Sequence, residues 1–303
     1  MAAGSRPASD LDHVSFAGKA GEKRRPLVAA PARRQAEQCA RVGWVDLKEP
    51  NALIVWLLHQ AGVRAEAYRA GPLQRRLGAC LRAIRATSVS QARRLLEERP
   101  ELVTTAVTAL LLGVSEFFRD TAVFEQLESD VLPELGRRHG VVRIWSAACS
   151  DGQELYSMAM LLSEQGLLER SALLGTDCRA DAVRRAREGL FLADRVCGLS
   201  IQRRERYFVP EGRMLRIHVT LRSRTRWQVH DLLKDPPAGG TWDLVLWRNT
   251  AVYLKPASAA AIWQKLAEAI RPGGFLVTGR AERPAGICGF TRAGRCVYRK
   301  LGG

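Results

Sequence analysis

The segment at 141–178 constrains the fold of this chain more than any other, because apolar runs, a tight turn and an acid follow one another within it. An apolar run at 141–145 leads into a small, polar turn at 147–152, and a segment with helical periodicity follows. A second apolar run, at 172–174, ends close to Asp177. This order predicts strand, turn, helix, strand and acid, the first half of a nucleotide-binding α/β domain. An ordinary βαβ unit with a tight turn is the alternative interpretation.

The predicted turn and the acid suggest how a ligand binds. A tight turn before a helix presents backbone N–H groups and the helix N-terminus to an anionic or polar ligand. An acid directly after the second strand suits the two hydroxyls of a ribose. Asp177 is therefore the first candidate binding residue.

Composition narrows the class of protein. With 303 residues, the chain is long enough for two domains of ordinary size. No apolar run approaches the roughly 18 residues of a membrane span, and the N-terminus lacks a secretory signal pattern. We therefore expect a cytoplasmic protein without membrane insertion. The seven cysteines include no C-x-x-C pair and predict neither disulfides nor a metal site.

The strongly basic balance favours an anionic partner. The formal net charge is +16, and residues 179–226 alone contain 13 arginines against five acidic residues. Such a charge suits nucleic acid, an acidic protein surface or a membrane face. An arginine-rich composition without any functional meaning is the alternative.

The periodicity of the remaining chain predicts its domains. Residues 1–45 lack sustained periodicity and are predicted to be a mobile basic arm. Residues 46–138 are predicted to form an N-terminal helical domain that ends in a linker helix at 115–136, and 139–303 an α/β domain. Within the α/β domain, short antiparallel strands at about 204–222 predict a β-subdomain. Further strands are predicted at 242–247, 275–278 and 296–300, with a helix at 257–270.

Several sequence blocks stand in an order that resembles the CheR type of chemotaxis receptor glutamate methyltransferase, which uses S-adenosylmethionine. Each block alone is weak, whereas their joint order is highly specific, and the resemblance runs from about residue 50 to the C-terminus. The blocks are Tyr68 with 74–77, 115–120, 144–157, 175–177, 206–208, 230–233, 248–249 with Tyr253, 272–274 and 279–282.

The resemblance implies a fold, an activity and a partner. The fold is of the α/β class: a Rossmann-like S-adenosylmethionine methyltransferase sheet with a small antiparallel β-subdomain, preceded by an all-α N-terminal domain. The activity is methyl transfer from S-adenosylmethionine to glutamate carboxylates, which forms methyl esters and S-adenosylhomocysteine. The partner is an acidic helix of a chemoreceptor-like or other signalling protein. We expect a monomer that binds no nucleic acid.

The resemblance also implies the site residues. Arg119 and Tyr253 are the predicted catalytic residues, and three arginines of a basic helix are predicted to bind the substrate: Arg75, Arg76 and Arg82. The predicted cofactor-binding residues are Ser115, Arg119, Ala148, Gly152, Glu154, Asp177, Asp231, Leu232, Arg248 and Asn249. Among these, Glu154 is expected to accept from the cofactor's ammonium and Asp177 from its ribose.

Some positions depart from the family pattern. Asp151, Gln153 and Leu155 replace threonine, glutamate and proline, and Arg280 replaces a histidine. Asp151 adds negative charge close to where the carboxylate of the cofactor is expected, which is unfavourable unless a cation compensates it.

The predicted chemistry needs few catalytic groups. A glutamate side chain, with a pKa of about 4.3, is already ionised at neutral pH, so the enzyme has mainly to desolvate and align it. The sequence offers no Cys–His or Ser–His pairing for covalent catalysis. Two alternatives stay open: a catalytically weakened cofactor-binding module in a signalling complex, and a nucleic-acid methyltransferase. The sequence at 235–237, Asp-Pro-Pro, lacks the aromatic residue of a base-methylation loop and is interpreted as a turn.

Overall fold

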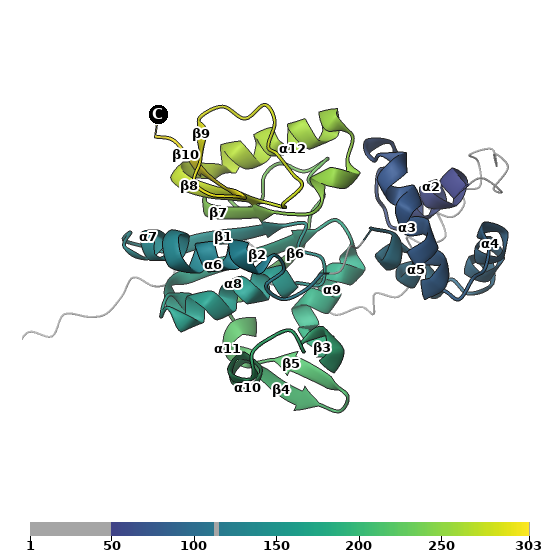
Figure 1. The fold of residues 1–303 in the computed structure, drawn as a ribbon, viewed down its shortest axis with the longest axis horizontal. Coiled ribbons are helices and arrows are strands. Elements are labelled where there is room, and N and C mark those ends of the chain that lie inside the picture. The colour runs from purple at the N-terminus through teal and green to yellow at the C-terminus, as the bar shows by residue number, and fades with distance from the viewer. Residues whose placement is uncertain (1–49, 112–114, 303) are drawn as a thin grey trace, which may run out of the picture. The chain divides into compact units, whose positions relative to one another are not determined.

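The computed structural model of the chain describes residues 50–111 and 115–302 (Figure 1). These residues fall within a single unit, Asp46–Gly303. The arm predicted at 1–45 lies outside the described residues.

The first described part is helical, as its apolar periodicity predicts. Four helices, α2 (Pro50–Gln60), α3 (Ala70–Ala83), α4 (Val89–Glu98) and α5 (Leu102–Leu111), follow one another, with the short turn η1 (Ala65–Ala67) after α2. Ser88 begins α4 with a cap, since its Oγ accepts a hydrogen bond from the N–H of Gln91. The helices enclose an apolar core of their own that includes Leu53, Leu57, Leu73, Leu77, Leu96 and Leu110.

The linker differs from the single helix predicted at 115–136. Residues 115–120 are irregular, and helix begins only at α6 (Thr121–Gln126), continues through the π-helical turn η2 (Leu127–Val131) and ends with α7 (Leu132–Gly136). Phe118 and Asp120 have positive φ angles, 51° and 61°, which a right-handed helix excludes. The N–H of Phe118 donates to Ser157 Oγ instead of to a helical carbonyl. A contact with the α/β domain therefore overrides the local helical periodicity.

A seven-stranded sheet organises the rest of the chain in the order β6-β2-β1-β7-β8-β10-β9. The first five of these strands run parallel, while β10 pairs antiparallel with β8 and with β9. Their bounds are β1 (Val142–Ala147), β2 (Ser171–Asp177), β6 (Thr225–Val229), β7 (Trp242–Trp247), β8 (Ile270–Thr278), β9 (Phe290–Arg292) and β10 (Val297–Lys300). The strand order reverses between β1 and β7, and ligands of open α/β sheets bind beyond the carboxyl ends of strands at such a point.

Successive side chains of a strand point to opposite faces of the sheet, so an apolar core forms on each face. On one face, Ile144 and Leu244 pack with α8 (Gln153–Glu164) and α9 (Ala180–Glu188). On the other, Trp145 and Val245 pack with α12 (Pro256–Ala269). Figure 1 shows α8 and α12 on opposite sides of the strands. Because both faces of these strands are buried, their sequences are continuous apolar runs.

The small β-subdomain is larger than the predicted 204–222. Its antiparallel sheet has the order β3-β5-β4 and begins at β3 (Leu190–Leu192), before β4 (Phe208–Glu211) and β5 (Met214–Ile217). Two short helices, α10 (Ile201–Tyr207) and α11 (Val219–Arg222), flank β4 and β5. A three-residue strand carries too little alternation to be recognised in the sequence. The short turns η3 (Leu168–Arg170), η4 (Ala193–Arg195) and η5 (Ala251–Tyr253) complete the connections.

The predicted fold class is confirmed: an α/β sheet with a small antiparallel sheet and a helical part before it. Within residues 50–111 and 115–302, no helix is both long and apolar enough to cross a membrane. The same residues contain no cluster of three or more His, Cys, Asp or Glu side chains suited to hold a metal ion.

Candidate functional site

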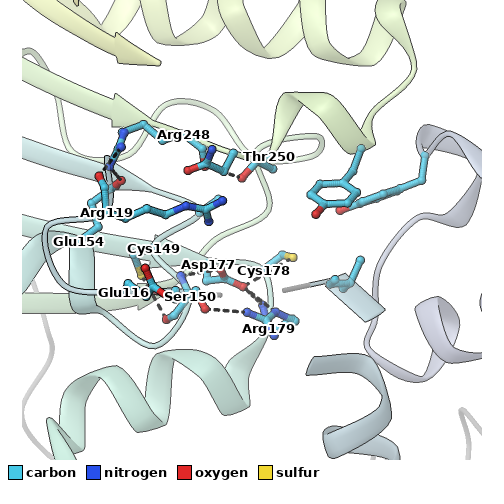
Figure 2. A pocket seen from close by; sticks show the side chains of 16 residues that line it. Glu116, Arg119, Cys149, Ser150, Glu154, Asp177, Cys178, Arg179, Arg248 and Thr250 are labelled. Carbon is cyan, nitrogen blue, oxygen red and sulfur yellow. Dashed lines mark hydrogen bonds and ion pairs between the residues drawn. The ribbon is translucent and has the colours of Figure 1, made fainter. Parts of the chain in front are cut away.

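A pocket lies where the strand order reverses, beyond the carboxyl ends of β1, β2 and β7 (Figure 2). Eight of the predicted site residues line it: Ser115, Arg119, Ala148, Glu154, Asp177, Arg248, Asn249 and Tyr253. Figure 2 shows the Arg119 side chain extending into the pocket between the levels of Thr250 and Asp177. The other lining residues are Tyr68, Leu111, Glu116, Cys149, Ser150, Cys178, Arg179 and Thr250.

The turn after β1 is tight and closely packed. Ala148 and Ser150 adopt positive φ angles of 62° and 53°, and Gly152 one of 92°. A Cβ atom on Gly152 would lie 2.7 Å from the Trp227 ring, and one on Gly175 only 2.4 Å from it. Gly152 is not among the residues that line the pocket, and its predicted contact with the cofactor stays a prediction. The glycine lets the turn pack against β6.

The charge that Asp151 adds to this turn is compensated. Arg185, from α9, pairs with Asp151 Oδ1 through Nη2 at 2.9 Å and with Asp181 Oδ2 through Nη1 at 2.7 Å. These carboxylates raise the pKa of Arg185, against the opposing effect of burial. The cation that Asp151 was expected to need is therefore Arg185 of α9.

Gln153, another departure from the family pattern, contacts the predicted cofactor-binding residue Ser115. Ser115 Oγ donates a hydrogen bond of 2.9 Å to Gln153 Oε1, which joins the loop before α6 to the start of α8. Leu155, which replaces a proline, is fully buried in the core of the sheet.

Asp177, at the end of β2, is already hydrogen-bonded. Its Oδ2 accepts from the N–H of Ser150 at 2.9 Å. Its Oδ1 accepts from the N–H and from Nε of Arg179, at 3.0 and 3.2 Å. Burial by itself lowers the pKa of Arg179, but the Asp177 carboxylate raises it above its ordinary value, so the guanidinium stays charged. Arg179 was not among the predicted site residues.

Arg248 connects both sides of the pocket from the end of β7. Its Nη1 donates to Glu154 Oε2 at 3.1 Å, and its Nη2 donates to Asp120 Oδ2 at 2.9 Å and to the carbonyl of Arg119 at 2.7 Å. Its side chain is 1% exposed. Glu154 Oε1 also accepts from Ser146 Oγ at 2.8 Å. Arg248 thus holds Glu154 and the segment that carries Arg119 in position.

A buried carboxylate shapes the loop after β7. Glu282 Oε2 accepts from the N–H groups of Asn249 and Gly279, both at 2.8 Å, and Oε1 accepts from that of Val252 at 3.3 Å. Asn249 takes a left-handed conformation, with φ of 60°. Burial raises the pKa of Glu282, and the backbone N–H groups oppose that rise. Glu282 belongs to one of the family-like blocks but was not predicted as a site residue.

Asp231 and Leu232 line a neighbouring pocket, which shares four residues with the first: Tyr68, Ala148, Cys178 and Thr250. Asp231 Oδ1 accepts from the N–H of Leu233 at 2.9 Å, and Oδ2 pairs with Lys234 Nζ at 3.2 Å. The predicted cofactor-binding role of Asp231 therefore competes with these local contacts. It stays a prediction.

The helical part contributes Tyr68 to both pockets. Tyr68 forms a bridge with Leu254, and the N–H of the next residue, Arg69, donates to the carbonyl of Tyr253 at 2.8 Å. Burial, together with Cys178 and Asp177, raises the pKa of Tyr68. Tyr68 therefore stays protonated at neutral pH.

The three predicted substrate-binding arginines of α3 differ in their surroundings. Arg75 and Arg82 are exposed, seven positions apart and hence on the same helix face. Arg76 is half-buried, and its Nη2 donates to the carbonyl of Ala109 in α5 at 2.9 Å. Arg76 therefore joins α3 to α5, which leaves Arg75 and Arg82 as the better candidates for contact with a partner.

The residues of the pocket suit S-adenosylmethionine. The carboxylates of Glu154 and Asp177 line it, and Arg119 extends toward the cavity, so the pocket offers acceptors and a cation to a polar ligand. The predicted contacts of Glu154 with an ammonium and of Asp177 with a ribose stay predictions. One feature fits less well, because Nη1 of Arg179 is buried and makes no hydrogen bond within the described part of the chain.

Comparison with known proteins gives a family match and curated relatives. The family described as CheR methyltransferase, SAM binding domain, matches residues 113–287. The chain is 34% identical over 189 residues to the "Chemotaxis protein methyltransferase" of Listeria monocytogenes, covering 62% of this chain and 72% of that protein. It is 33% identical over 201 residues to "Chemotaxis protein methyltransferase 1" of Pseudomonas aeruginosa, covering 62% and 73%.

Among solved structures, the S-adenosylmethionine-dependent methyltransferase SibL in its apo form is similar at 16% identity and a TM-score of 0.35. The similarity covers 82% of this chain and 53% of SibL.

Proposed function

The chain belongs to the CheR family of methyltransferases that use S-adenosylmethionine, and from this premise we propose that it methylates glutamate side chains of a chemoreceptor-like protein. The products are glutamyl methyl esters and S-adenosylhomocysteine. The names of the curated relatives place those proteins in chemotaxis.

The scarcity of bases among the described residues that line the pocket carries this proposal, since Glu116 is the one exposed carboxylate among them. They include no histidine or lysine. Burial raises the pKa of Cys178 to about 12 and that of Cys149 well above its usual value, so both thiols stay protonated. An acceptor such as an amine would need a group to take its proton. A carboxylate needs none, because it is already ionised at neutral pH.

Five of the pocket residues then have positioning roles in the proposed reaction. When bound, S-adenosylmethionine supplies a methyl group on a positively charged sulfur, and a carboxylate oxygen accepts it as the carbon–sulfur bond breaks. Arg119 orients the acceptor carboxylate through its planar guanidinium. Glu154 and Asn249 hold the methionine portion, Asp177 the ribose, and Tyr253 packs beside the acceptor. No proton has to be transferred.

The exposed arginines of α3 support an acidic partner. Both Arg75 and Arg82 are exposed, and in this proposal they contact carboxylates of a helix that carries the target glutamates. The arginine-rich segment 179–226 offers less free charge than its composition suggests. Six of its arginines form ion pairs with carboxylates of this chain: Arg179, Arg184, Arg185, Arg203, Arg216 and Arg224. The nucleic-acid alternative is accordingly less favoured.

The proposal is tested by incubating the protein with methyl-labelled S-adenosylmethionine and cytoplasmic fragments of chemoreceptors. We expect label on the fragments that mild base releases as methanol, because esters hydrolyse in base and methylamines do not. Base-stable label contradicts the ester. Cofactor binding without transfer to any fragment favours the non-catalytic signalling module, and label on added RNA favours a nucleic-acid methyltransferase.

A further inference from the structure

The carboxylate of Asp177 has little hydrogen-bonding capacity left. It is 6% exposed and accepts three hydrogen bonds of 3.2 Å or less: from the N–H of Ser150 on Oδ2, and from the N–H and Nε of Arg179 on Oδ1. The thiol of Cys178, a weak donor, also lies 4.0 Å from Oδ1. An ionised carboxylate offers about four acceptor positions. About one position is therefore open, on Oδ2. A ribose that donates both of its hydroxyls to this carboxylate needs two.

Among the three close donors, only one can leave without a change of the backbone. The N–H groups of Ser150 and Arg179 belong to the turn after β1 and to the start of α9, and both are set by the fold. The Nε of Arg179 sits on a flexible side chain, at 3.2 Å from Oδ1. Figure 2 shows this guanidinium beside Asp177 and Ser150 at the side of the pocket.

The guanidinium of Arg179 is itself incompletely paired. It is buried, with 4% of the residue exposed, and its Nη2 reaches Ser150 Oγ only at 3.5 Å. Its Nη1 makes no hydrogen bond to any residue in the ranges that the structure describes. A buried donor without a partner is unfavourable, so this arrangement is less stable than a fully paired one and gives way more readily to a competing ligand.

We propose that Arg179 competes with the cofactor's ribose for Asp177, so that binding of the ribose diol displaces the Nε of Arg179 from Oδ1. This inference rests on the ribose role proposed for Asp177. A displaced guanidinium still interacts favourably with Asp181 and Asp151, whose charges already act on Arg179. Arg179 therefore weakens cofactor binding and reduces the contribution of the ribose diol to the binding free energy. In the free protein, it keeps the buried carboxylate of Asp177 paired.

Two ligands of the unmodified protein test this competition. Calorimetry at pH 8 compares the dissociation constants of S-adenosylhomocysteine and of its 2′,3′-dideoxy analogue. We expect removal of the diol to weaken binding by about tenfold or less, because one of the gained hydrogen bonds replaces a lost one. A larger loss overturns the proposal, since the diol would then bind without a competitor.

A variant supplies the second test. Arg179→Met keeps an unbranched apolar stem and removes the donors, so we expect it to bind S-adenosylhomocysteine about tenfold more tightly than the unmodified protein. The gain should disappear with the dideoxy analogue. Arg184→Met is the matched control, because Arg184 lies exposed on α9, the helix that begins directly after Arg179, and pairs with Glu188. We expect it to change neither constant.

Equal or weaker binding by Arg179→Met overturns the competition. If this variant does not fold, the comparison of the two ligands on the unmodified protein decides alone. Both readouts measure binding of the cofactor product, so failure of methyl transfer to receptors leaves them intact. A failure of the competition likewise leaves the proposed methylation standing.

Discussion

The two halves of the pocket are held in place by different means. In the first half, at the ends of β1 and β2, charged side chains pair with one another: Asp151 with Arg185, and Asp177 with Arg179. In the second half, at the end of β7, three backbone N–H groups converge on the single carboxylate of Glu282. Paired side chains can change together during evolution, whereas a carboxylate that binds backbone groups has no partner residue that could change with it.

Two of the departures from the family pattern illustrate this difference. Asp151 and Gln153 lie in the first half, and each has a partner there, Arg185 and Ser115. In the second half the corresponding block keeps its glutamate, Glu282. Arg280 also departs from the family pattern, and its side chain is 58% exposed. Its Nη1 lies 3.9 Å from Asp120 Oδ1, too far for a strong ion pair.

The largest expected effect comes from the residue that joins the two halves. Arg248→Met leaves Glu154 and Asp120 without their buried cation, which should lower the free energy of unfolding by about 3–5 kcal/mol. Urea denaturation measures the change. Arg280→Met is the control, because that side chain is exposed and we expect no measurable loss. A small effect of Arg248→Met would mean that the halves hold their positions independently.

Arg119→Ala tests whether the residue proposed to orient the acceptor carboxylate acts independently of the residues proposed to hold the cofactor. We expect transfer to fall by about 100-fold or more, since an oriented charged donor near a reacting group is worth that much. Binding of S-adenosylhomocysteine should stay measurable, because Glu154 and Asp177 remain. Labelled transfer and calorimetry provide the two readouts. Full activity in this variant would refute the role of Arg119.

Glu282→Gln tests the second half alone. A glutamine amide places a donor where one carboxylate oxygen accepts, so the loop that carries Asn249 loses support. We expect cofactor binding to weaken by about tenfold, measured by calorimetry. Glu268→Gln, at an exposed position of α12, is the control. Unchanged binding by Glu282→Gln would show that the loop keeps its conformation without the carboxylate.

The raised pKa of Glu282 adds a prediction on pH. The folded protein holds this proton more tightly than the unfolded chain, so the stability from this group is fully present below the unfolded pKa of about 4.3. It is lost as the pH rises through the folded value. The unfolding free energy of the unmodified protein should therefore fall relative to that of Glu282→Gln from about pH 4 upward. Denaturation curves at several pH values measure this difference, and parallel profiles would contradict it.

The smallest change in cofactor affinity is expected from a substitution in the first half of the pocket. Arg185→Ala leaves Asp151 uncompensated beside the cofactor and should weaken its binding by about threefold, because the pair is partly exposed. Asp151→Thr together with Arg185→Ala should restore the affinity. This double-variant cycle, measured by calorimetry, isolates the coupling between the two charges. Additive effects would show that Arg185 does not compensate Asp151.

The sequence predicted the parts of the site that follow from strand order. Ala148 directly follows β1, Asp177 ends β2 and Asn249 comes shortly after β7. The carboxyl ends of parallel strands meet at one edge of a sheet. Their presence in one pocket therefore needed only the apolar pattern and the family resemblance. The helix predicted at 115–136 was wrong in its first six residues, because periodicity does not register the contact of Phe118 with Ser157.

The tertiary structure decided which charged groups pair. Arg179 and Arg185 are two of the 13 arginines in their region, and no local pattern distinguishes them from the others. They act on the pocket because α9 places them beside Asp177 and Asp151. Glu282 and Tyr68 likewise reach the site from distant parts of the chain. A sequence determines periodicity and strand order locally, whereas the partner of a buried charge depends on distances that only the folded chain sets.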